Sequence, residues 1–220
     1  MGAGVLNFLN GVPVGHYRIA VPTGLTTGLA ANAPIFSARW ASANYIRALV
    51  TKLSVTANLV TPFTTAQEIN AAAYIARSWS ADDTGGTAIV LTAPTNMQNS
   101  LADAAPTCTM RAATAAATTA GTRTLDSNAI LFASGSQTLA AASAFPETVA
   151  DTFQAVSADV GFPINFQSGN SPVAGLGTYY GPEGIVATIG PTAQGAGGTV
   201  RYIIEMEWLE YNVQSNIGMM

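Results

Sequence analysis

Two glutamates near the end of the chain have the spacing that could best support chemistry. Glu205 and Glu207 lie two positions apart in a stretch that alternates apolar and polar residues. On a β-strand such residues share a face and lie roughly 6–7 Å apart. Paired carboxylates at this separation do acid–base work in glycosidases. They are also typical of a solvated strand face. Because no aromatic cleft is indicated nearby, we favour an ion pair with an arginine of a neighbouring subunit.

The side chains that most often act as nucleophiles, bases or metal ligands are scarce. The chain has one histidine, His16, in a glycine-rich segment, and one cysteine, Cys108, among small residues. A general base needs a positioned partner, and a Cys/His zinc site needs four ligands. We therefore expect a structural or exposed His16 and a buried Cys108 thiol. We predict no catalytic residue, no cofactor and no metal.

Two further patterns resemble ligand-binding loops. Asp82 and Asp83 could supply oxygen ligands to calcium, but the motif DDTGG lacks the alternating acidic spacing of a calcium loop and favours a turn between strands. The glycine-rich motif GAGG at 195–198 precedes a strand. A phosphate-binding loop would need a helix after it, so the phosphate hypothesis fails.

The composition indicates a weakly charged protein. Apolar residues make up 49% of the 220 residues and charged residues only 9%, against about a quarter in ordinary soluble domains. Such a surface keeps free monomers apart poorly, so we expect it to be covered in an assembly; the alternative is a compact protein with a small-residue surface. The sequence contains no run of about 18 apolar residues, so it predicts no membrane-spanning segment. The eight Lys and Arg residues form no cluster and the net charge is −4, which argues against nucleic-acid binding.

The stretch 199–211 predicts the central strand of the fold. Five large apolar residues occupy alternate positions, which places them on one face: Val200, Tyr202, Ile204, Met206 and Trp208. Arg201, Glu205 and Glu207 fall on the opposite, polar face. Trp40 and Trp79 are, like Trp208, expected to be core or interface anchors. If the three tryptophans were exposed together, they could form a platform for a host sugar.

Other strands are expected throughout the chain. Their ranges are 34–42, 44–60 with a bend or bulge, 71–80, 87–92, 107–114, 127–134, 163–167 and 185–189, with a short β piece at 16–21, a helical turn or loop at 64–70 and a strand or short helix at 144–156. This pattern predicts an all-β fold, an antiparallel β-sandwich that is jelly-roll-like, with an extended N-terminal arm and little helix. We expect the arm at 1–33, one sandwich domain at 34–211 and a C-terminal tail at 212–220.

Several motifs resemble those of virion proteins of tailed bacteriophages. They are FTTAQE at 63–68, ARSW at 76–79, DTGGT at 83–87, AGTRTLD at 120–126, EGIV at 183–186 and the final strand ending in WLE at 208–210. The resemblance implies a β-sandwich or jelly-roll subunit of a homo-oligomer, often a trimer, located in the virion. It implies contacts with other virion proteins, such as the major capsid protein. The role it implies is non-enzymatic: capsid decoration or cement, or alternatively a tail- or fibre-associated protein that contacts the host surface.

Overall fold

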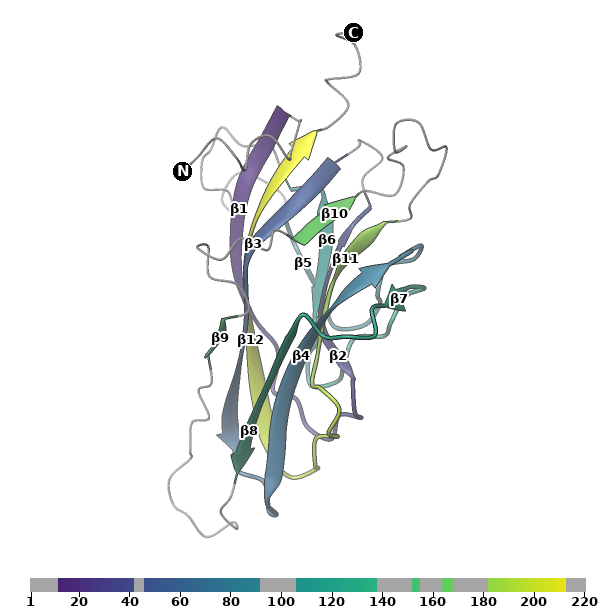
Figure 1. Ribbon diagram of the computed structural model, residues 1–220. Helices are drawn as coiled ribbons and strands as arrows, with labels where there is room; N and C mark the ends of the chain where they lie inside the picture. Colours follow the sequence, from purple (N-terminus) through teal and green to yellow (C-terminus); the bar gives the residue numbers. More distant parts are fainter. Residues whose placement is uncertain are drawn as a thin grey trace, which may run out of the picture.

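The structure, a computed structural model, describes residues 12–41, 46–91, 106–137, 152–154, 164–167 and 182–212. Within these ranges the chain forms strands β1 to β12 and no helix. The strands pair antiparallel in two sheets that face each other (Figure 1). The prediction of an all-β, antiparallel β-sandwich is confirmed. The jelly-roll connectivity stays a prediction.

The first sheet is built around the strand at the end of the chain. Its order is β1-β12-β3-β10, and β9 also pairs with β3. The strands are β1 (Val12–Pro22), β12 (Thr199–Asn212), β3 (Ile46–Thr61), β10 (Ile164–Gln167) and β9 (Thr152–Gln154). Along its length β12 is hydrogen-bonded to β1 on one side and to β3 on the other. It is therefore an interior strand, as its apolar face predicts.

The long strand β3 contains the irregularity that its length predicts. Its pairing with β12 shifts register between Val50 and Lys52, which leaves Thr51 as an extra residue. Before this bulge the buried Val50 faces the core, and after it the buried Leu53 does. One inserted residue moves the apolar side chains to the other parity of the strand. The bulge thus keeps both halves of β3 packed on the same core.

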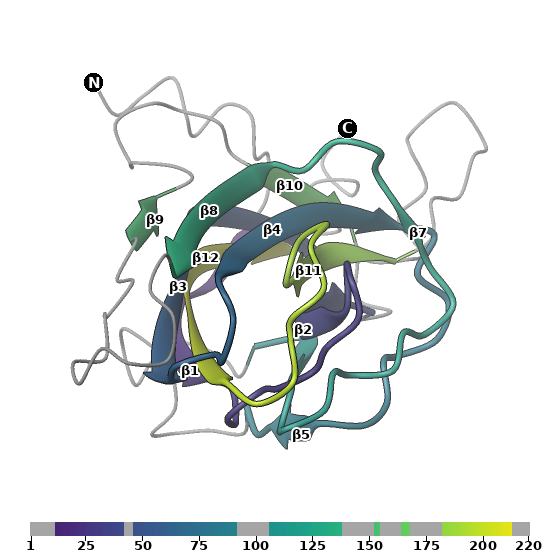
Figure 2. The ribbon, with the colours of Figure 1, turned by 90° about the horizontal axis from the view of Figure 1, so that it is seen from below.

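The second sheet has the order β5-β6-β2-β11-β4-β7, with β8 also paired with β4. The strands are β5 (Thr87–Ile89), β6 (Cys108–Ala112), β2 (Pro34–Trp40), β11 (Glu183–Thr188), β4 (Gln67–Arg77), β7 (Thr124–Leu125) and β8 (Leu131–Gln137). All six residues of β11 are buried, because β2 and β4 flank it and both its faces are covered. Seen from below, the two sheets form opposite walls around the core (Figure 2).

Two expectations differ from the structure. Residues 64–70 were predicted to form a helical turn or loop, but β4 already begins at Gln67 and pairs with β8 from there on. The buried side chains of Ile69 and Ala71 face the core, and this packing outweighs the local capping signal at 65–68. Within the predicted arm at 1–33, Val12–Pro22 is β1, an edge strand of the sandwich.

The glycines and prolines of this N-terminal segment are compatible with an extended strand. Tyr17 and Ile19 are buried against the core, and the register shifts once, between Pro13 and Gly15. The short β piece predicted at 16–21 is thus confirmed as part of β1. Residues 1–11 lie outside the described residues, as does the predicted segment 144–156 apart from β9. Of the predicted tail at 212–220, Asn212 ends β12 and the rest lies outside the described residues. In the described part of the chain, no helix has the length and apolar character needed to cross a membrane.

Candidate functional site

The polar face of β12 carries a row of charges on the outside of the first sheet. Glu205 Oε2 lies 2.7 Å from Lys52 Nζ on β3, and Glu207 Oε1 lies 2.7 Å from His16 Nε2 on β1. Arg201 is exposed. Both glutamates therefore have partners within their own chain, and an ion pair with an arginine of a neighbouring subunit stays a prediction. All four paired side chains are more than a third exposed, so each pair contributes at most about 1 kcal/mol.

The opposite face of β12 holds the aromatic anchors. Trp40, Tyr202 and Trp208 are at most 1% exposed and belong to the main core. The rings of Trp208 and Tyr17 pack with their centroids 5.2 Å apart. Trp79 is also only 1% exposed. No tryptophan presents a ring face to solvent, so the alternative of an exposed sugar platform is wrong.

Next to Trp208 lies a buried carboxylate that the sequence interpretation missed. Glu210 is 0% exposed. Its Oε1 accepts hydrogen bonds from the indole nitrogens of Trp40 (3.0 Å) and Trp208 (3.1 Å). Its Oε2 accepts from the backbone nitrogen (3.0 Å) and the hydroxyl (2.9 Å) of Thr107. Burial raises the pKa of Glu210, while these hydrogen bonds from uncharged donors act in the opposite direction.

The alternation of core-facing and outward-facing residues along β12 indicates that Glu210 is buried. Even positions from Val200 to Trp208 face the core, and Glu210 continues the same parity. A glutamate is seldom placed in a core, because burying an unpaired charge is costly. Cys108 is buried nearby, and burial, with a smaller effect of Glu210, raises the pKa of its thiol well above the usual value. The prediction of a buried thiol is confirmed.

Trp79 lies outside the main core, on the outer face of the second sheet. It forms a small buried cluster with Ala76 and Val186. The guanidinium carbon of Arg123 lies 4.7 Å from the centroid of the Trp79 ring, which is within cation–π range. Arg123 also forms an ion pair with Asp83, and both side chains are almost completely buried. Burial lowers the pKa of Arg123 to about 10, so the guanidinium is still charged at neutral pH.

Arg77 joins two further segments to this region. Its Nε and Nη2 donate to the two carboxylate oxygens of Asp126 (2.9 and 3.1 Å), and its Nη1 donates to Glu183 Oε1 (2.6 Å). The hydrogen bonds with Asp126 are the main cause that raises the pKa of Arg77. Gly184, next to Glu183, lies under Trp79: a Cβ there would come within 2.8 Å of the indole ring. Only a glycine fits this position without a shift.

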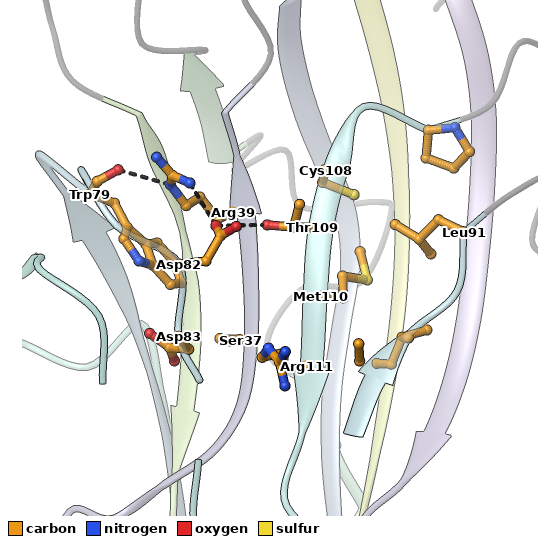
Figure 3. Close-up of a pocket in the computed structure, with 13 residues that line it drawn as sticks. Ser37, Arg39, Trp79, Asp82, Asp83, Leu91, Cys108, Thr109, Met110 and Arg111 are labelled. Carbon is orange, nitrogen blue, oxygen red and sulfur yellow. Dashed lines mark hydrogen bonds and ion pairs between the residues drawn. The ribbon is translucent and has the colours of Figure 1, made fainter. Parts of the chain in front are cut away.

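A groove of about 420 Å³ opens beside Trp79, between β2, β6 and the turn that follows the tryptophan (Figure 3). Arg39 Nε donates to the carbonyl oxygen of Trp79 (2.8 Å), and Arg39 Nη1 donates to Asp82 Oδ1 (2.6 Å). The hydroxyl of Thr109 donates to the same carboxylate oxygen (3.0 Å). Arg111 donates to the carbonyl oxygen of Gly85. Arg39, Asp82 and Thr109 therefore form one connected hydrogen-bond network on the polar side of the groove.

The two aspartates of the DDTGG motif form ion pairs with arginines. Asp82 pairs with Arg39 and Asp83 with Arg123. Gly85 and Gly86 have φ values of 67° and 56°, the left-handed conformation that tight turns require. In the described residues no group of three or more His, Cys, Asp or Glu side chains could hold a metal ion. The motif forms a turn, as the sequence interpretation favoured.

Comparisons with protein-family models, with curated proteins and with solved structures find no match for this chain. Function must therefore be inferred from the contacts of the chain itself. These contacts define three places: the charged outer face of the first sheet, the buried carboxylate beside Trp208, and the groove beside Trp79 with its ion pairs. Of the sequence-predicted candidates, Trp40, Tyr202 and Trp208 come together in the core. Trp79 is separate from them, and Arg201, Glu205 and Glu207 share the outer face.

Proposed function

We propose that this chain is a non-enzymatic structural protein of a tailed-phage particle, and specifically a decoration or cement protein of the capsid. The observation that carries the proposal is the place where the phage-like segments meet. Segments 76–87, 120–126 and 183–186 are far apart in the sequence, yet their charged residues bond to one another on the second sheet.

The contacts in this region are of a structural kind. Arg77 binds Asp126 and Glu183, and Arg123 binds Asp83 and covers Trp79. An active site directs such groups toward a place that a substrate can occupy. Here guanidinium and carboxylate groups are directed at each other and fasten loops to the sheet. Motif residues used in this way support a scaffold role for the segments that resemble virion proteins.

The low charge of the sandwich is compatible with assembly into an oligomer. With charged residues at only 9% of the chain, its surface offers little electrostatic repulsion between copies. A decoration protein binds at many equivalent positions of a particle, so weak contacts made by each subunit of an oligomer combine into strong attachment. We propose a symmetric homo-oligomer, a trimer, that contacts the major capsid protein.

Localisation on the particle tests this proposal. Purified particles are analysed by mass spectrometry and labelled with gold-coupled antibodies against this chain. We expect the protein in the particle, label over the capsid and a copy number that fits capsid symmetry. Absence from particles would overturn the proposal. Label confined to the tail would overturn the capsid assignment and support the tail- or fibre-associated alternative.

The oligomeric state is tested independently in solution. Sedimentation of the full chain over a range of concentrations should show a trimer that dissociates on dilution. A protein that remains monomeric at high concentration would contradict the oligomer. A stable dimer would contradict the trimer only.

A further inference from the structure

An exposed aromatic ring and a carboxylate lie close together on the outer face of the second sheet. Phe132 on β8 is 54% exposed, and its cross-strand neighbour on β4 is Ala72. Glu68 accepts hydrogen bonds from the hydroxyls of Ser134 (2.7 Å) and Thr192 (3.0 Å). Since Ser134 and Phe132 are two positions apart on one face of β8, the carboxylate is held about 7 Å along the strand from the phenylalanine. We call Glu68, Ser134 and Phe132 the β8 patch.

Glu68 differs from the other carboxylates of the described residues. Those carboxylates pair with Arg, Lys or His or, in the case of Glu210, are buried among hydrogen-bond donors. Glu68 is exposed and has hydroxyl partners but no cationic one in this part of the chain. The two hydroxyls lower its pKa, so the carboxylate is charged at neutral pH. The β8 patch thus offers a partner an apolar anchor and an uncompensated negative charge.

The outer face of the first sheet carries the opposite combination. Arg201 on β12 is exposed, and no ion pair is formed by it within the described residues. Ile203 is half-buried and lies beside the exposed Pro22 of β1. Arg201 and Ile203 share the outer face of β12, two positions or about 7 Å apart along the strand. We call Arg201, Ile203 and Pro22 the β12 patch.

The two patches match in charge, spacing and direction. β4 and β12 begin at the same end of the sandwich and run in the same direction (Figure 1). Glu68 is near the start of β4 and Arg201 near the start of β12. In each patch the charge precedes the apolar group along this direction. A rotation about an axis roughly parallel to the strands can therefore place Glu68 opposite Arg201 and Phe132 opposite Ile203 at the same time.

We propose that the β8 patch of one copy of this chain binds the β12 patch of the next copy. Glu68 pairs with Arg201, and Phe132 packs on Ile203 and Pro22. A second copy is the partner because each patch finds its complement in charge and spacing on the same chain. The patches lie on different sheets, so the contact joins unlike surfaces. Such a contact gives a ring when its rotation closes, and closure after three copies gives the trimer. This inference rests on the homo-oligomer proposed above and assigns the residues that hold it together.

Charge reversal tests the ion pair. Sedimentation equilibrium of the full chain is compared with that of Glu68→Arg, Arg201→Glu and the double variant. Each single variant places like charges opposite each other, so we expect about ten-fold weaker association. The double variant exchanges the two signs and should associate like the original protein. Arg18→Glu, the same change at an exposed arginine of the first sheet outside the β12 patch, is the matched control and should also associate normally.

The apolar half of the contact is tested separately. Phe132→Ser removes the exposed ring, and we expect about ten-fold weaker association. Urea unfolding should show a stability close to that of the original protein, because the ring is half exposed. Val90→Ser, at an exposed apolar residue outside both patches, is the control. Phe132→Ser decides the question if a charge variant does not fold. Association as strong as that of the original protein in all the single patch variants would overturn the proposal.

Mixing two variants distinguishes a contact between unlike surfaces from one between like surfaces. Phe132→Ser keeps an intact β12 patch, and Arg201→Glu keeps an intact β8 patch. A mixture of the two should form a heterodimer with one intact contact, but no ring. If either variant alone still forms a stable dimer through its intact patch, the contact joins like surfaces and the proposal is overturned.

The results also separate this contact from the function proposed above. A full chain that stays monomeric at high concentration would overturn both the oligomer and the contact. A full chain that associates, with patch variants that associate equally well, would overturn the contact alone. Patch variants that keep their oligomeric state but no longer attach to particles would show that the patches bind another virion protein, which overturns the self-contact. The particle-localisation experiment is independent of all these results.

Discussion

Two buried carboxylates, each beside tryptophan, are stabilised in different ways. Glu210 lies in the main core and accepts hydrogen bonds from Trp40, Trp208 and Thr107, all of them uncharged donors. Asp83 lies on the outer face of the second sheet and forms an ion pair with Arg123. Neither carboxylate is more than 2% exposed. The same chemical group is thus held once by dipoles and once by a full opposite charge.

This difference in stabilisation determines which substitutions destabilise each carboxylate site most. Around Glu210 the negative charge is spread over several hydrogen bonds, so the loss of one donor leaves the others. Around Asp83 one guanidinium supplies the compensating charge, and its loss leaves an isolated charge in a buried place. The Glu210 site depends on the packing of large aromatic residues. The Asp83 site has one charged partner, Arg123, and one further hydrogen bond, from the backbone nitrogen of Gly121 (2.8 Å).

The largest effect is expected where packing and hydrogen bonding are lost together. Trp208→Ala removes a fully buried indole and one donor to Glu210, and should lower the free energy of unfolding by about 5 kcal/mol. Glu207→Ala, the preceding residue on the exposed face, should cost less than about 1 kcal/mol. Thermal melting and urea unfolding of both variants measure the two effects. Equal losses would show that the two faces of β12 are assigned incorrectly.

The next effect concerns the ion pair. Arg123→Met keeps most of the side-chain volume but leaves Asp83 buried without its partner, so we expect a loss of about 3–4 kcal/mol in urea unfolding. The double variant Asp83→Asn with Arg123→Met should regain part of this loss, because no charge is then left unpaired. Arg18→Met, at an exposed position, is the control and should stay within about 0.5 kcal/mol. A loss no larger than that of the control would contradict the importance of the pair.

The two central strands of the first sheet, β12 and β3, could be predicted from the sequence, whereas most of the edge strand β1 was expected to be part of an extended arm. The alternation from Val200 to Trp208 is a local property, and it identified β12 and its buried face. The length of β3 indicated the bulge now located at Thr51. The capping-box spacing at 65–68 is also local, but it gave the wrong result, because β4 pairs with β8 from Gln67 onward.

The contacts of the candidate site join residues that are far apart in the sequence, so they could not be predicted from local patterns. Arg77 binds residues 49 and 106 positions away, and no local pattern specifies such partners. The partners of Glu205 and Glu207 follow from the register of three strands, which sets residues of β1 and β3 beside β12. Glu210 has the same parity as the core-facing residues of β12, which predicts burial, but a charged side chain is seldom expected in a core.

A smaller loss of stability is expected from Trp→Phe substitutions, and its size should differ between Trp208 and Trp79. Trp208→Phe loses a hydrogen bond to a buried carboxylate and should cost about 1–3 kcal/mol beyond the change in packing. Trp79→Phe loses an N–H that has no partner among the described residues, so only the packing term remains. Urea unfolding should show the larger loss for Trp208→Phe. The reverse order would indicate that the Trp79 N–H has a partner in the free protein.

The smallest effect is a difference in pH dependence. The pKa of Glu210 is raised above its ordinary value of 4.5 in the folded protein. Between the unfolded and the folded pKa, the folded state binds more protons, so the contribution of Glu210 to stability falls as the pH rises through this window. Glu210→Gln has no such titration, and its urea midpoint should fall less as the pH is raised from 4.5 toward neutrality. Identical slopes for the two proteins would mean that the hydrogen bonds from Trp40, Trp208 and Thr107 fully compensate the burial of the charge.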